Sequence, residues 1–112
     1  MAAAATTIFA LTVRATAAIT QNRGITLAGA VPAANAAGYI AMTGGAIGDL
    51  VTVNMVGTTV AEAGAAIPAR GTSLSFDATG RLITATTSTV VARSVGTAAA
   101  AGDQIEVSII PN

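Results

Sequence analysis

Residues 72–85 constrain the fold of this chain more than any other stretch of its sequence. Small polar and large apolar residues alternate from Thr72 to Phe76, which is the period of a strand with one buried face. The next four residues, DATG, form a turn signal. Asp77 can accept a hydrogen bond from the backbone two residues on, and Gly80 can adopt the positive φ that such a turn requires. Residues 81–85 return as the partner strand, so the sequence predicts a β-hairpin with Asp77 and Gly80 as structural turn residues.

Short segments rich in Val, Ile and Thr recur along the chain between Gly-, Pro- and Asn-containing turns. Besides the hairpin, strands are expected at residues 8–13, 25–27, 39–42, 50–56, 90–95 and 105–110. Residues 60–66 are ambiguous, because AEAGAA could form one helical turn that Pro68 would stop. No amphipathic helical period extends beyond about two turns. The pattern therefore predicts an all-β fold, a sandwich or a small barrel.

Two sequence patterns occur in both halves of the chain, in the same order. Residues 23–27 (RGITL) resemble residues 70–74 (RGTSL), and residues 46–53 (AIGDLVTV) resemble residues 100–107 (AAGDQIEV). The longer second half contains the predicted hairpin. Either the two halves are pseudo-equivalent β units, or the match is a chance similarity between segments rich in Ala and Gly.

The composition excludes several classes of function. A formal net charge of zero, 9% charged residues and 3% aromatic residues give neither the basic surface nor the stacking platform of a nucleic-acid binder. The absence of His and Cys removes most transition-metal sites, thiol chemistry and the usual general base. The aspartates at 49, 77 and 103 could form a carboxylate cluster, but each stands beside a turn Gly, so we expect structural turns, including Gly102 and Asp103. No cofactor, no metal and no enzyme activity are predicted.

The apolar residues predict contacts with other subunits. The chain has 28 Ala against 25 Ile, Leu and Val, so a monomer would bury little apolar area per residue. Residues 24–48 carry no charge, but Pro32, Asn35 and several Gly argue against a membrane span. The predicted strand at 8–13 is apolar on both faces, so it is either central in the sheet or covered by another subunit. We expect partner contacts from Ile8, Phe9, Leu11, Val13 and Arg14.

From about residue 15 to residue 111 the chain resembles the bacteriophage capsid cement, or head decoration, proteins. The resemblance rests on residues 61–67 (AEAGAAI), 70–74 (RGTSL), 77–81 (DATGR), 95–103 (VGTAAAAGD) and the apolar last strand at 105–110. Thr97 departs from the family pattern, in which an aliphatic residue often continues. The first half matches only loosely, and residues 1–13 do not align.

The resemblance implies a β-tulip or barrel-like sandwich. From the sequence itself we expect residues 14–112 as a single β domain, preceded by residues 1–13 as an extended N-terminal arm. The resemblance also implies a non-catalytic homo-oligomer, most often a trimer, that is made in the bacterial cytoplasm and binds the major capsid protein on the outside of an icosahedral head. There it would stabilise contacts between capsomers. The competing hypothesis is a non-catalytic surface- or carbohydrate-binding β module of a virion or secreted protein, which would need exposed aromatic side chains.

Overall fold

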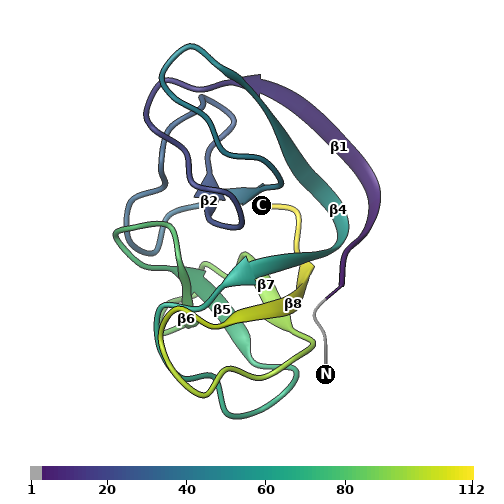
Figure 1. Ribbon diagram of the computed structural model, residues 1–112. Helices are drawn as coiled ribbons and strands as arrows, with labels where there is room; N and C mark the ends of the chain where they lie inside the picture. Colours follow the sequence, from purple (N-terminus) through teal and green to yellow (C-terminus); the bar gives the residue numbers. More distant parts are fainter. Residues whose placement is uncertain (1–3) are drawn as a thin grey trace.

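The computed structural model describes residues 4–112, and it confirms the predicted all-β class. Eight strands form one antiparallel sheet that curls into a nearly closed barrel (Figure 1). The strands are β1 (Thr6–Arg14), β2 (Gly24–Ile25), β3 (Tyr39–Ala41), β4 (Leu50–Glu62), β5 (Ser73–Phe76), β6 (Leu82–Thr84), β7 (Ala92–Ser94) and β8 (Gln104–Ile109). Residues 1–3 of the predicted arm lie outside the described residues, and the boundary predicted at residue 13 falls inside β1.

The order of the strands in the sheet is β2-β3-β4-β8-β7-β5-β6, and β1 pairs with β4 beside this path. β4 is the longest strand and connects the two ends of the molecule (Figure 1). Its first part pairs with β1 and β3, and its last part pairs with β8. The structure resolves the ambiguity at residues 60–66 against a helical turn, because Val60, Ala61 and Glu62 complete β4 and are held in register by β8.

Two apolar clusters fill the interior, one on each side of the bend in β4. Side chains alternate along β8: Ile105, Val107 and Ile109 are buried, whereas Ser108 is exposed. The larger cluster comprises Ile40, Ala61, Ala63, Ile67, Leu74, Phe76, Leu82, Val91, Ala92, Ala98, Ile105 and Val107. The second comprises Ala15, Ile19, Ile25, Tyr39, Ala41, Val51, Val53 and Ile109.

The strand registers of the two halves correspond. The pairing of β1 with the first part of β4 corresponds to the pairing of the last part of β4 with β8. Likewise, the β2–β3 pair corresponds to the β5–β7 pair. The β3–β4 pair corresponds to the β7–β8 pair. Hence the first part of β4 is the counterpart of β8. This correspondence agrees with the predicted match between residues 46–53 and 100–107. The other predicted match is wrong by two residues, because Gly24 corresponds to Ser73 instead of Gly71.

The hairpin forms as predicted from β5 and β6. Asp77 Oδ1 accepts hydrogen bonds from the backbone N–H of Thr79 and Arg81, both at 2.9 Å, and Gly80 has a φ of 82°. This hairpin occupies the place that the loop between β2 and β3 occupies in the first half, which is why the second half is longer. Within residues 4–112, no helix is long and apolar enough to cross a membrane.

Candidate functional site

β1 carries three exposed large apolar side chains, those of Ile8, Phe9 and Leu11. It pairs with β4 along its whole length, yet eight of its nine residues are exposed and only Val13 is half-buried. The side chains of Ile8, Phe9 and Leu11 are 74%, 50% and 38% exposed. The predicted contact residues therefore lie together on one strand. Val13 is the exception in environment, because it packs against the second core cluster.

β1 is an edge strand, so the alternative that residues 8–13 form a central strand is wrong. The backbone groups of Thr52 face β3, since Met42 N donates to Thr52 O at 2.7 Å and Thr52 N donates to Thr43 Oγ1 at 3.0 Å. In an antiparallel ladder the residue opposite Thr52, which is Thr12, then directs its own N–H and C=O away from β4. Within the described residues β1 pairs with no strand other than β4, so this outer edge can accept another strand.

Arg14 ends β1 and begins a second exposed area that the sequence interpretation missed. Its Nη1 donates to Gly48 O at 2.8 Å, and Arg14 lies opposite Leu50 in the β1–β4 ladder. Ile47 and Leu50 are 73% and 62% exposed. The sequence contains a signal for these two residues: large aliphatic residues stand at Ile47 and Leu50, where the matching segment 100–107 has Ala101 and Gln104.

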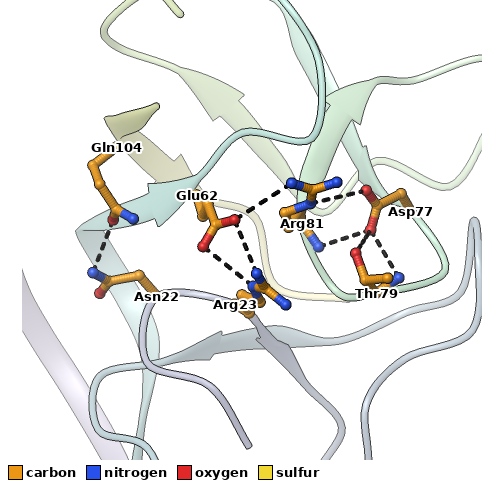
Figure 2. Close-up of polar contacts among 7 residues, drawn as sticks. All are labelled: Asn22, Arg23, Glu62, Asp77, Thr79, Arg81 and Gln104. Carbon is orange, nitrogen blue, oxygen red and sulfur yellow. Dashed lines mark hydrogen bonds and ion pairs between the residues drawn. The ribbon is translucent and has the colours of Figure 1, made fainter. Parts of the chain in front are cut away.

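A polar network joins the two halves of the chain on another face of the barrel (Figure 2). Arg23 donates to both carboxylate oxygens of Glu62, at 3.2 Å and 3.1 Å. Arg81 Nη1 lies 3.6 Å from Glu62 Oε2, and Arg81 Nε lies 3.6 Å from Asp77 Oδ2. Beside this chain of charges, Asn22 Nδ2 donates to Gln104 Oε1 at 2.9 Å. The network holds the turn before β2 against the end of β4, so its role is to fix the two halves relative to each other.

All three aspartates have structural roles in turns. Burial of Asp77 would raise the pKa of its carboxyl group, but the Thr79 hydroxyl, the backbone N–H groups of Arg81 and Thr79 and the charge of Arg81 together lower it. Asp49 Oδ2 accepts from Ala46 N at 2.8 Å. Asp103 Oδ2 accepts from the backbone N–H of residues 99 and 100, and Gly102 before it has a φ of 93°.

The aromatic side chains do not form a stacking platform. Tyr39 and Phe76 are buried, and Phe9 on β1 is the exposed one. The Tyr39 hydroxyl is held by the last residue of the chain, because it donates to Asn112 O at 2.9 Å and accepts from Asn112 N. The prediction of a carbohydrate-binding module, which needs exposed aromatic side chains, thus finds little support in the arrangement of these residues.

Comparison with known proteins identifies a family and a similar solved structure among the matches. The model of the phage cement protein family matches residues 3–109. The crystal structure of the N base of the head fiber gp8.5 of bacteriophage phi29 has the same fold, with a TM-score of 0.73 and 24% sequence identity over 91% of this chain and 93% of that chain. No curated protein sequence gives a significant match. Because the family model covers nearly the whole sequence, the chain belongs to the phage cement protein family, whose members are phage capsid-associated structural proteins.

Proposed function

We propose that this protein is a capsid decoration, or cement, protein that binds the outside of an icosahedral phage head and stabilises contacts between capsomers of the major capsid protein. The observation that carries the proposal is β1. An exposed edge strand with apolar side chains is a liability for a protein that stays free in solution, and natural proteins usually protect such edges with Pro, Lys or a bulge. β1 contains no Pro and no Lys, and Arg14 at its end is its one charged residue. Its register with β4 shifts around Phe9, but residues 10–14 form a regular ladder and keep an outer edge without a bulge.

Strand addition is the mode of binding that this surface favours. An extended segment of a partner can form backbone hydrogen bonds with the outward-facing N–H and C=O groups of β1, such as those of Thr12. Such hydrogen bonds supply affinity. Ile8, Phe9 and Leu11 then provide the apolar contacts that select the segment. This role needs no catalytic group, in keeping with a chain in which the aspartates serve turns.

In this proposal the protein acts as a homo-oligomer, with a trimer as the expected state. It is made in the host cytoplasm and then binds the capsid surface. The low charge and the small Ala-rich core support close packing with other subunits. Sedimentation equilibrium of the purified chain measures the oligomeric state directly.

Co-sedimentation with expanded, undecorated heads of the cognate phage tests the function. We expect saturable binding, at about one copy per major capsid subunit if trimers occupy every three-fold position. The variant Ile8→Ser/Phe9→Ser removes the two most exposed apolar side chains of β1, and its affinity for heads should fall at least about tenfold. Val95→Ser, an exposed apolar residue of the second half, is the matched control and should bind as the wild type does.

Thermal unfolding of each variant shows whether the fold is intact. Absence of wild-type binding to cognate heads would reject the cement function. Full binding by the folded β1 variant would reject β1 as the contact surface and leave the function to another face.

A further inference from the structure

We propose that Arg14, Ile47 and Leu50 form a second docking site, here called the 47–50 tip, for an apolar segment of the major capsid protein that carries a carboxylate. The inference rests on the proposed capsid function and adds a place and a chemistry to it. The two halves of the chain use the same backbone at this position but carry different side chains there.

The loops that carry the 47–50 tip and its counterpart have the same hydrogen bonds. Ala15 N donates to Asp49 O and Gly48 N donates to Ala15 O, each at 2.8 Å. In the second half Ala63 N donates to Asp103 O and Gly102 N to Ala63 O, again each at 2.8 Å. The glycines also share their backbone conformation, with φ values of 92° and 93°. Position by position, the counterparts of Arg14, Ile47 and Leu50 are Glu62, Ala101 and Gln104.

In the second half this position is already a docking site. The turn at Asn22 and Arg23 contacts it: Asn22 Nδ2 donates to Gln104, and Arg23 forms its ion pair with Glu62 (Figure 2). Glu62 N also donates to Asn22 O at 2.9 Å, whereas Ala101 and Gln104 remain exposed. The contact is heterologous, since the turn comes from one half and the surface from the other. A heterologous contact made once leaves one such surface without its turn, and here that surface is the 47–50 tip, which exposes two large aliphatic side chains.

The residues at the tip are not required by the fold. Ala101 and Gln104 occupy the same backbone positions in the second half, so an alanine and a glutamine are compatible with this loop and this strand. Ile47 and Leu50 nevertheless expose most of their apolar surface to solvent, at a cost that a partner would remove.

Charge selects the class of occupant. The counterpart of the Asn22–Arg23 turn is Gly71–Thr72, which is the segment that a second copy of this chain would offer to the tip if it repeated the internal contact. Arg70 is exposed beside it, and Arg93 Nη1 lies 3.3 Å from Gly71 O, so both would approach Arg14 with like charge. Like charges at an interface suppress a partner. Arg14 uses one N–H on Gly48 O, and within residues 4–112 it has no ion-pair partner, so its remaining donors suit a carboxylate.

The test transfers the residues of the second half onto the first. The variant Ile47→Ala/Leu50→Gln and the variant Arg14→Gln are titrated against expanded heads beside the wild type, with Val95→Ala as the matched control. We expect an unchanged melting temperature, about a tenfold or greater loss of affinity for the double variant, and a loss of several-fold, about three to ten, for Arg14→Gln. Val95→Ala should bind normally.

The outcomes separate this inference from the proposed function. Wild-type binding together with full binding by Ile47→Ala/Leu50→Gln overturns the 47–50 tip and leaves the function in place. A change in the sedimentation mass of the free double variant would show that the tip faces a second copy, which also overturns the inference. If the double variant unfolds, Ile47→Ala alone decides, because residue 47 lies in a loop and outside the strand.

Discussion

Arg23 and Glu62 form a two-point ion pair that joins the halves of this protein: the guanidinium donates to both carboxylate oxygens, and Glu62 retains only 13% of its side-chain exposure. Glu62 is also the residue toward which Arg81 points (Figure 2). A single carboxylate thus balances two arginines, one from each half. Glu62 therefore links the turn before β2 to the β5–β6 hairpin.

Glu62→Gln should lower the free energy of unfolding by about 1–3 kcal/mol, because it leaves two partly buried guanidinium groups without their carboxylate. Chemical denaturation measures the loss. Glu106→Gln is the matched control, since Glu106 makes no ion pair with any residue in 4–112, and it should change stability little. Equal effects of the two substitutions would contradict the role of Glu62.

Gly24→Ala should destabilise the fold through Phe76. A Cβ at residue 24 would lie 2.6 Å from Phe76 Cε1, and Phe76 is fully buried, so the ring or the strand must move at a cost of about 1–3 kcal/mol. Replacing Phe76 with Leu frees part of this space, so Phe76→Leu should cost less in the Gly24→Ala background than in the wild type. Gly96→Ala, where the nearest atom is 3.7 Å away, is the control. Simple additivity of the two changes would refute the steric argument.

Asp77 should make the protein less stable in acid. Because the folded state lowers the pKa of Asp77, ionisation of this group contributes stability above the pKa of the unfolded chain, about 3.9 for Asp. That contribution is lost as the pH falls through the lower, folded pKa. The stability difference between the wild type and Asp77→Asn should therefore shrink from about pH 6 to about pH 2 in denaturation experiments. A constant difference would show that the carboxylate charge is not what matters.

Asn54→Ala should weaken the bend in β4. Asn54 is fully buried, and its Nδ2 donates to Thr58 O and to Thr7 Oγ1, both at 3.1 Å, where β4 passes from β1 to β8. Loss of this donor should cost about 1–3 kcal/mol and increase amide exchange in β1. Thr52→Ala on the same strand is the comparison, because among the described residues the Thr52 hydroxyl makes no hydrogen bond. Unchanged exchange in β1 would separate Asn54 from the docking of that strand.

The sequence alone determined the features that depend on neighbouring residues. Asp77 and Gly80 specify their hairpin through local backbone geometry, and alternation in residues 105–109 specifies which face of β8 is buried. The density of turns and the lack of a helical period were enough for the all-β class. The match between residues 46–53 and 100–107 indicated the repeat, because a shared turn with Gly and Asp imposes the same backbone in both places.

Only the tertiary structure decided what depends on distant residues. The length of β4 was beyond the sequence pattern, since residues 60–62 become a strand because β8 pairs with them. Residues 8–13 read equally well as a central strand or a covered edge, and the structure makes β1 an edge because, among the described residues, it pairs with β4 and with no second strand. The exposure of Ile47 and Leu50, and the burial of Glu62 between two arginines, follow from a docking of the halves that no local pattern encodes, because burial is a property of the whole packed chain.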